Sequence, residues 1–257
     1  MPNWNSFSNY MDVRAAARSV AHKIRSNEID VGRQHYALGL LHGVIQAVHC
    51  GYEKIVAVEL GVAGGGGLLE LCKAADFFRT ETGIEIEVYG FDNATGLPPG
   101  SGHKDHPEIW RDGQFSMGDP NNLIAKLPDF AHLIIGDVEE TIKKFEYKIF
   151  GSRLGFVSID LDYYSSTKSA MGIFEMHPLF YVPALPVYLD DIEVLITYNP
   201  WCGEEKAVEE FNQSHEFRKI HRKPNFAIHN FSVCQILDHP IRTGEIQPRF
   251  QFEIGPF

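Results

Sequence analysis

The 257-residue sequence is long enough to bury the core of one sizeable α/β domain, and its 44% hydrophobic content is ordinary for a globular protein. Its formal net charge of −11, without a dense cluster of Lys and Arg, argues against a nucleic-acid partner, because phosphate binding requires a basic face. The four cysteines form no C-x-x-C pair, no apolar run approaches the ~18 residues of a membrane span, and the N-terminus lacks a signal-peptide core. We expect a cytoplasmic protein with reduced thiols and no nucleic-acid or membrane partner.

The first fifty residues are expected to be helical. Apolar residues recur at helical spacing between Val13 and Ile24. A second helix is expected over 33–49, where apolar residues from Leu41 to Val48 share one face.

After residue 53 the pattern changes to short apolar runs that alternate with amphipathic segments. We expect strands at 54–60, 84–91, 131–137, 154–162, 185–191 and 231–237. Helices are expected at about 67–82, at 138–145, from about 165 onward and at 203–215. This alternation predicts an α/β, doubly wound, mostly parallel sheet with helices on both faces. We therefore divide the chain into an N-terminal helical extension or cap, 1–52, and a main domain, 53–257.

A glycine-rich loop follows the first expected strand, with five glycines at Gly61 and Gly64 to Gly67. Glycine costs ordering entropy, but its bare backbone turns tightly and approaches a ligand closely, and the next helix offers free N–H groups. The spacing does not match the G-x-G-x-x-G loop of dinucleotide-binding proteins or a P-loop. Glu59 precedes the first glycine by two positions, and Asp92, after the second strand, is placed to bind ribose hydroxyls.

Four aspartates end two strands that we expect to be neighbours. Asp160 and Asp162 are two residues apart, so they would point to one side of an extended strand, and Asp190 and Asp191 end the next strand. Neighbouring strands lie ~4.8 Å apart, so these carboxylates would meet at the ligand-binding edge. They would repel one another and take up protons unless a cation such as Mg²⁺ were bound. Alternatively, Asp191 caps the following segment and the others bind cofactor or face water.

Seven segments form a series along about residues 55–212: "VELGVAGGG", "VYGFDNATGLPP", "WRDGQF", "IIGDVEET", "IDLDYYSSTKSA", "VYLDDI" and "EEKAVEEF". In this order they resemble the macrocin O-methyltransferase-like (TylF-type) family of class I S-adenosylmethionine-dependent methyltransferases, metal-dependent enzymes that methylate sugar hydroxyls on antibiotics. The prolines before the Asp-Asp pair, the loop "GSGHKDHPEI" and the C-terminal tail depart from the family pattern. These departures fall near the expected acceptor site, so the resemblance does not identify the acceptor.

The resemblance implies a seven-stranded Rossmann-like methyltransferase sheet, S-adenosylmethionine as cofactor, and Mg²⁺ or a similar divalent cation. The residues expected to bind the cofactor are Glu59, Gly61, Val62, Gly65, Asp92, Asp137 and Asp160. The residues expected to bind the metal are Asp162, Asp190 and Asp191. We expect Asp162, or His106 in the long loop after the second strand, to act as the catalytic base. The expected acceptor is a small molecule with a sugar hydroxyl or vicinal diol.

Several features leave alternatives open. Tyr164 and Lys168 form a Tyr-x-x-x-Lys pair that would favour an NAD(P)-dependent oxidoreductase, although the glycine spacing and the aspartates argue against it. A non-catalytic cofactor-binding protein would not need the aspartates. Trp110 and Phe115 in the long loop either line the acceptor pocket or pack as a lid. The N-terminal helices are expected to cover the active site and to pair subunits in a homo-oligomer.

Overall fold

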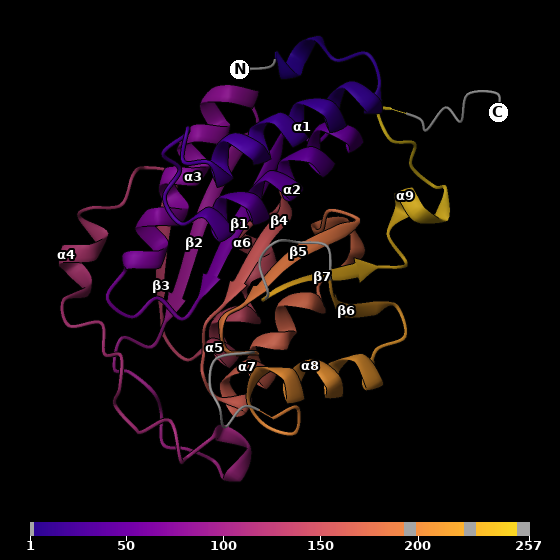
Figure 1. Ribbon diagram of the computed structural model, residues 1–257. Coiled ribbons are helices and arrows are strands. Elements are labelled where there is room, and N and C mark those ends of the chain that lie inside the picture. The colour runs from indigo at the N-terminus through magenta and orange to yellow at the C-terminus, as the bar shows by residue number, and fades with distance from the viewer. Residues whose placement is uncertain (1–2, 193–198, 224–229, 251–257) are drawn as a thin grey trace.

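The computed structural model describes residues 3–192, 199–223 and 230–250 (Figure 1). Its centre is a seven-stranded sheet with the strand order β3-β2-β1-β4-β5-β7-β6. The strands are β1 (Lys54–Leu60), β2 (Glu85–Asp92), β3 (Ala131–Ile135), β4 (Arg153–Ile159), β5 (Ala184–Leu189), β6 (Arg218–Arg222) and β7 (Phe231–Ile236). Strands β1 to β5 are parallel, and β7 runs antiparallel to both β5 and β6. The predicted doubly wound, mostly parallel sheet is confirmed.

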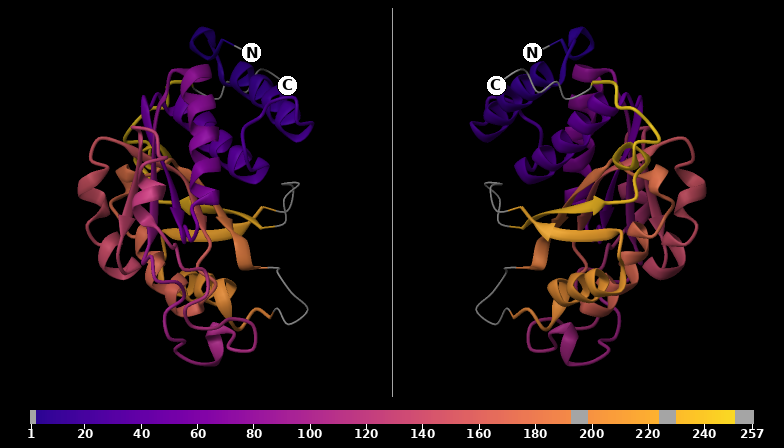
Figure 2. Two further views of the ribbon diagram at one scale, coloured as in Figure 1. Left: turned by 90° about the vertical axis from the view of Figure 1, so that its left-hand side faces the viewer. Right: turned by 90° about the vertical axis from the view of Figure 1, so that its right-hand side faces the viewer.

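Helices cover both faces of this sheet, which Figure 2 shows nearly edge-on. The α-helices are α1 (Tyr10–Arg25), α2 (Gln34–Cys50), α3 (Gly66–Thr82), α4 (Pro120–Ile124), α5 (Val138–Ile142), α6 (Phe145–Lys148), α7 (Tyr164–Ala170), α8 (Gly203–Ser214) and α9 (Pro240–Thr243). Short 3₁₀ turns are η1 (Trp4–Ser6), η2 (His103–Asp105), η3 (Met171–Phe174), η4 (Pro178–Phe180) and η5 (Asp190–Ile192). The single helix expected at 138–145 is divided into α5 and α6. Within the described residues, every helix is too short or too polar to cross a membrane.

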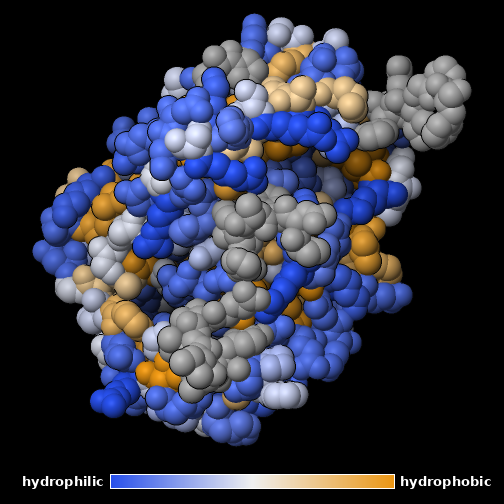
Figure 3. All heavy atoms as spheres, viewed as in Figure 1, coloured by the Kyte–Doolittle hydropathy of each residue, from blue (hydrophilic) through white to orange (hydrophobic). Residues whose placement is uncertain are grey.

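The two N-terminal helices differ in their packing. Helix α1 buries only the stripe from Val13 to Ile24 that its periodicity predicted, and this stripe packs on α2. Helix α2 is buried on most sides because it lies between α1 and strands β4 and β5. Gly43 allows this close approach, since a side chain there would collide with the backbone of Gly155 in β4. On the face seen in Figure 3, hydrophilic residues predominate and the hydrophobic ones are scattered.

The strand ends and one edge differ from the sequence-based expectations. Strand β4 ends at Ile159 and β5 at Leu189, so the four aspartates lie in the loops beyond them, not in extended strands. Strand β6 was not predicted, because its sequence "RKIHR" is charged and lacks the apolar run used to find the other strands. It forms an edge of the sheet, where only one neighbour, β7, is needed.

Strands β1 and β4 are parallel neighbours in the sheet. The chain continues from β1 to β2 toward one edge of the sheet and from β4 to β5 toward the other edge, so the strand order reverses between β1 and β4. Ligands of doubly wound sheets bind beyond the carboxyl ends of the strands at such a switch point. Both the glycine-rich loop after β1 and the aspartates after β4 lie at this edge.

Candidate functional site

A cavity of about 450 Å³ opens at the carboxyl ends of β1, β2, β4 and β5. This volume lies within the ~300–1,000 Å³ range typical of small-molecule sites. Nine of the residues proposed from the sequence line it: Glu59, Gly61, Val62, Asp92, Asp137, Asp160, Asp162, Asp190 and Asp191. Gly65 and His106 are not among its lining residues.

The glycines of the loop serve two purposes. Gly61 has φ +89°, and a side chain there would collide with the backbone carbonyl of Asp160, so this glycine lets β1 and the loop after β4 lie close together. Gly65, with φ +87°, precedes α3 and packs against Leu123. By contrast, Cβ atoms added at Gly64 and Gly66 would meet no protein atom within 4 Å, although both residues line the cavity. The space beside these two glycines fits a ligand that contacts the backbone.

Glu59 anchors a buried polar network beneath the loop. It is only 1% exposed, and its Oε1 accepts a hydrogen bond from the Tyr36 hydroxyl at 2.7 Å. The hydroxyl of Ser158 in turn donates to Tyr36 at 3.1 Å. Burial raises the pKa of Glu59 to about 8, and the nearby Asp160 adds to this shift while the Tyr36 hydrogen bond opposes it. Its Oε2 has no hydrogen-bond partner among the described residues, so this acceptor at the cavity wall is available to a ligand.

Asp92, at the end of β2, holds the glycine-rich loop in place. Its Oδ2 accepts hydrogen bonds from the backbone N–H groups of Val62 and Ala63 at 2.9 and 2.8 Å. Its Oδ1 accepts one from Ala94 at 2.6 Å. Each carboxylate oxygen can accept two hydrogen bonds, so the predicted contact with ribose is compatible with this role. Asp137 lines the cavity and also caps α5, since it accepts a hydrogen bond from the Glu139 N–H at 2.8 Å.

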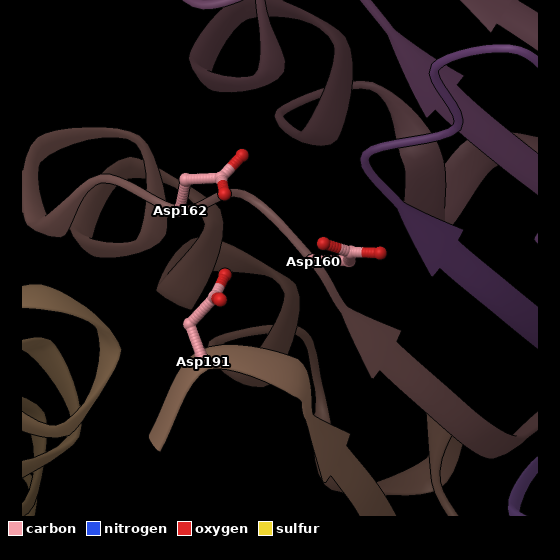
Figure 4. Close-up of side chains that lie close together, drawn as sticks. All are labelled: Asp160, Asp162 and Asp191. Atoms are coloured by element: carbon pink, nitrogen blue, oxygen red, sulfur yellow. The ribbon is translucent and has the colours of Figure 1, made fainter. Parts of the chain in front are cut away.

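Three aspartates that line the cavity converge beyond the ends of β4 and β5 (Figure 4). Asp160, Asp162 and Asp191 each offer a carboxylate oxygen, and these oxygens lie within 4.8 Å of one another. Burial and mutual repulsion raise the pKa to about 7 for Asp160 and Asp162 and to about 8 for Asp191. Oδ2 of Asp191 is buried and has no hydrogen-bond partner among the described residues. Such a set of oxygen ligands suits a hard divalent cation such as Mg²⁺.

This trio differs from the metal-binding set inferred from the sequence, which contained Asp190 and assigned Asp160 to the cofactor. Asp190 begins η5, and its Oδ1 accepts a hydrogen bond from the Tyr188 hydroxyl at 2.8 Å. It lines the cavity and its charge raises the pKa of Asp160 and Asp162, but it is not one of the three converging residues. The difference arises because β4 and β5 end early, so the loops and not the strand pleat orient the side chains.

Asp162 has an unusual backbone conformation. Its φ of +59° lies in the left-handed region, which Asp tolerates better than most residues. A hydrogen bond from the Tyr163 N–H to the Leu161 carbonyl, 2.5 Å long, closes a tight turn around it. The turn directs Asp162 toward Asp191 (Figure 4). Local backbone strain of this kind is often found at functional sites.

Glu204, in the first turn of α8, is a further acidic residue that the sequence analysis missed. Its side chain is fully buried, at 0% exposure. Oε1 accepts a hydrogen bond from the Leu161 N–H at 3.4 Å and Oε2 accepts one from the Asp191 N–H at 3.1 Å. Burial and the charge of Asp191 raise its pKa well above the usual range. Glu204 therefore connects the two loops that carry the aspartate trio. Only its position in an acidic helix after the Asp-Asp pair could have indicated this role.

The long loop of 93–118 forms another wall of the cavity. Trp110 and Phe115 both line it and meet edge to face, with ring centroids 5.9 Å apart. Asp105, only 1% exposed, anchors the loop to α7, because its carboxylate accepts hydrogen bonds from the backbone and the hydroxyl of both Ser101 and Ser165. The imidazole of His106 is buried and pairs through Nδ1 with Glu108 at 2.8 Å.

The two residues of the Tyr-x-x-x-Lys pair lie outside the cavity. Tyr164 and Lys168 lie on α7, and both bind Glu210 of α8, at 2.7 and 2.8 Å. Lys104 binds the same carboxylate at 2.9 Å. Neither Tyr164 nor Lys168 lines the cavity. Their interactions join α7, α8 and the long loop, so the pair gives no support to the oxidoreductase alternative.

Comparison with known proteins identifies the architecture. No protein-family model matches the chain, and no curated protein sequence does. Solved structures do match. The calicheamicin methyltransferase CalS11 aligns with a TM-score of 0.51 and 18% identity over 79% of this chain and 78% of that chain. The O-methyltransferase NovP aligns with a TM-score of 0.56 and 14% identity over 79% and 78%. This chain has a Rossmann-like methyltransferase fold. At these identities the likeness concerns the fold alone.

Proposed function

We propose that this protein is a metal-assisted, S-adenosylmethionine-dependent O-methyltransferase that acts on a hydroxyl group of a small molecule. The observation that carries the proposal is the juxtaposition, in one cavity, of the glycine-rich loop with the trio of Asp160, Asp162 and Asp191. A binding protein for the cofactor would need the first feature but not the second. The names of the two structural neighbours, a methyltransferase and an O-methyltransferase, support the same choice.

The glycine-rich side fits the methyl donor. Gly64 and Gly66 leave open space at the cavity wall, and the unpartnered Oε2 of Glu59 offers an acceptor. Asp92 holds the glycine-rich loop through two hydrogen bonds from the loop's backbone, so the loop has its shape before a ligand binds. We propose that Glu59, Gly61, Val62, Asp92 and Asp137 surround S-adenosylmethionine, and that Gly65 acts indirectly by shaping the loop.

The aspartate side fits a divalent cation. A cation held by Asp160, Asp162 and Asp191 would act as a Lewis acid and lower the pKa of an acceptor hydroxyl. Asp162 is our proposed base, because its carboxylate lines the cavity beside the other two aspartates, where an acceptor hydroxyl would lie. Asp162 would take the proton of the acceptor hydroxyl, and bound S-adenosylmethionine would supply the methyl group to the acceptor oxygen and leave as S-adenosylhomocysteine.

The remaining walls would orient the acceptor. Trp110 and Phe115 offer apolar surfaces, against which the ring of a sugar or another small molecule can pack. If the acceptor is a vicinal diol, its second hydroxyl would also lie near the aspartates, and this second contact would favour one orientation of the acceptor in the cavity. Holding donor and acceptor together lowers the entropic part of the barrier. His106 is the weaker candidate for the base, because it is buried against Glu108 and lies outside the cavity lining.

Calorimetric titration with S-adenosylhomocysteine, with and without Mg²⁺, tests the proposal, and NADH serves as the control ligand. We expect S-adenosylhomocysteine to bind in the micromolar range and NADH not to bind. A panel of sugars and catechols would then be assayed for S-adenosylhomocysteine release in Mg²⁺ and in EDTA. Binding of NADH without S-adenosylhomocysteine would refute the methyltransferase proposal.

A further inference from the structure

Arg33 is a basic residue in an otherwise acidic cavity. It immediately precedes α2, whose N-terminus lies at the same edge of the sheet as the glycine-rich loop. Among the described residues that line the cavity, it is the single cationic side chain, and seven lining residues are Asp or Glu. Arg33 is therefore the one side chain among them that attracts a ligand carboxylate.

The guanidinium of Arg33 is held in place and remains available. It lies over the ring of Tyr36, 5.4 Å from the ring centroid. Tyr36 is itself fixed, because Glu59 accepts its hydroxyl hydrogen bond and Ser158 donates one to it. Arg33 forms no ion pair within residues 3–192, 199–223 and 230–250. A guanidinium has five N–H donors, so contact with one ring leaves donors for a ligand carboxylate.

Arg33 also lies near the acids that face the glycine-rich loop. Burial lowers the pKa of Arg33, but the neighbouring Tyr36 hydroxyl and the carboxyl groups of Glu59 and Asp160 oppose this effect and the net shift is upward. Among the described residues, the lining of the cavity therefore presents one cationic side chain and several acidic ones to a ligand. An amino acid in its zwitterionic form carries the complementary pair of charges.

We infer that Arg33 binds the carboxylate at the amino-acid end of S-adenosylmethionine. This assignment rests on the proposed function and adds to it a recognition residue from outside the segments that resemble the methyltransferase family. It also orients the cofactor, since the amino-acid end is directed toward α2 and the adenosine toward β2 and β3.

The test compares two ligands that differ only at this end. S-adenosylhomocysteine carries the amino-acid group, whereas 5′-methylthioadenosine retains the adenosine and the thioether but lacks it. Both are titrated calorimetrically into the unchanged protein and into Arg33→Ala, Arg33→Lys and Arg18→Ala. Arg18 is an exposed arginine on α1, so its removal changes the net charge equally at a site away from the cavity.

We expect Arg33→Ala to weaken binding of S-adenosylhomocysteine by about 10- to 100-fold, the effect of losing a charged hydrogen-bond partner. Binding of 5′-methylthioadenosine should change by less than about twofold. Arg33→Lys should show a smaller loss, because it retains the charge without the planar fork, and Arg18→Ala should show none.

Three outcomes would overturn the inference. Equal losses for both ligands in Arg33→Ala would mean that Arg33 supports the cavity as a whole. An unchanged affinity for S-adenosylhomocysteine would mean that Arg33 does not contact the ligand. If neither ligand binds the unchanged protein, the proposed function fails as well, so this result is distinct from the other two.

Discussion

The two sides of the cavity are built in opposite ways. On the glycine-rich side, hydrogen bonds within the protein satisfy the key acid, because Asp92 accepts three backbone N–H groups. On the aspartate side, Asp160, Asp162 and Asp191 converge within 4.8 Å, and burial and repulsion raise their pKa values. On the first side the carboxylate of Asp92 is paired within the protein, whereas on the second side the three carboxylates lack a positive charge between them. Backbone geometry thus shapes the glycine-rich side, whereas an excess of negative charge marks the aspartate side.

The largest expected effect comes from removing a charge on the aspartate side. Asp162→Asn should lower kcat by about 1,000-fold, since the variant loses both a proposed metal ligand and the proposed base. Asn tolerates the left-handed backbone at this position, and the loss of repulsion should preserve or raise the melting temperature. Single-turnover methyl transfer and thermal melting measure the two effects.

Asp190→Asn is the matched control for that variant, because Asp190 lines the cavity but lies outside the trio. We expect it to lose much less activity. If Asp190→Asn were as inactive as Asp162→Asn, the set of Asp162, Asp190 and Asp191 inferred from the sequence would be the better description of the metal site.

Two glycine variants probe the other side. Gly61→Ala should destabilise the protein by about 3 kcal/mol, because it combines an unfavourable φ with a collision against the Asp160 carbonyl. Gly64→Ala should change stability by less than about 1 kcal/mol, since the added Cβ meets no protein atom. However, it should weaken S-adenosylhomocysteine binding at least about tenfold by filling ligand space. Urea unfolding and calorimetry separate the effects, and unchanged binding in Gly64→Ala would show that the ligand lies elsewhere.

The pH dependence of stability provides a third comparison. Glu59 and Asp160 have pKa values of about 8 and about 7 in the folded protein, above their usual 4.5 and 3.8. Unfolding therefore releases protons, so in EDTA the free energy of unfolding should fall as pH rises, by at least about 2 kcal/mol between pH ~6.5 and ~8. The raised pKa values of Asp162, Asp191 and Glu204 add to this fall. Below pH ~6.5, His35 and His42 have the opposite effect on the free energy of unfolding. Their pKa values are lowered in the folded protein, so unfolding takes up protons and stability rises with pH there.

Urea unfolding at several pH values, in EDTA and in excess Mg²⁺, measures this effect. Excess Mg²⁺ should make the free energy of unfolding depend less on pH, because the cation stabilises the charged carboxylates of the folded protein. A free energy of unfolding that rises between pH ~6.5 and ~8 in EDTA would contradict the raised pKa values.

The smallest expected effect concerns Glu204, which connects the two aspartate loops. Glu204→Gln keeps one carbonyl acceptor but replaces the other oxygen with a donor, so one of the two backbone hydrogen bonds is lost. Mn²⁺ affinity, measured by electron paramagnetic resonance, should fall about tenfold, as for residues that orient metal ligands. Glu209→Gln, on the same helix but paired with Lys206 at the surface, is the control. Equal losses in both variants would mean that Glu204 has no positioning role.

The sequence predicted most of the regular structure because the interior strands and their helices are defined by local hydrophobic patterns. Strand β1 has the bounds expected for it, and the strands that lie between two others in the sheet were all found. Strand β6 was missed, since an edge strand needs only one partner and can be polar. The order of the motifs was likewise sufficient to bring the glycine-rich loop and the aspartates to one edge.

The sequence by itself thus determined the type of sheet and the edge at which its polar residues gather, because strand direction and loop position follow from chain order. Only the tertiary structure decided which carboxylates converge, that Asp190 binds Tyr188 and that Glu204 connects the two loops. It also placed Arg33, at the start of a helix without a recognised motif, inside the cavity. Glu204 joins loops that are separate in the chain, and even for near neighbours such as Tyr188 and Asp190 the side-chain direction beyond a strand end depends on packing that no local pattern encodes.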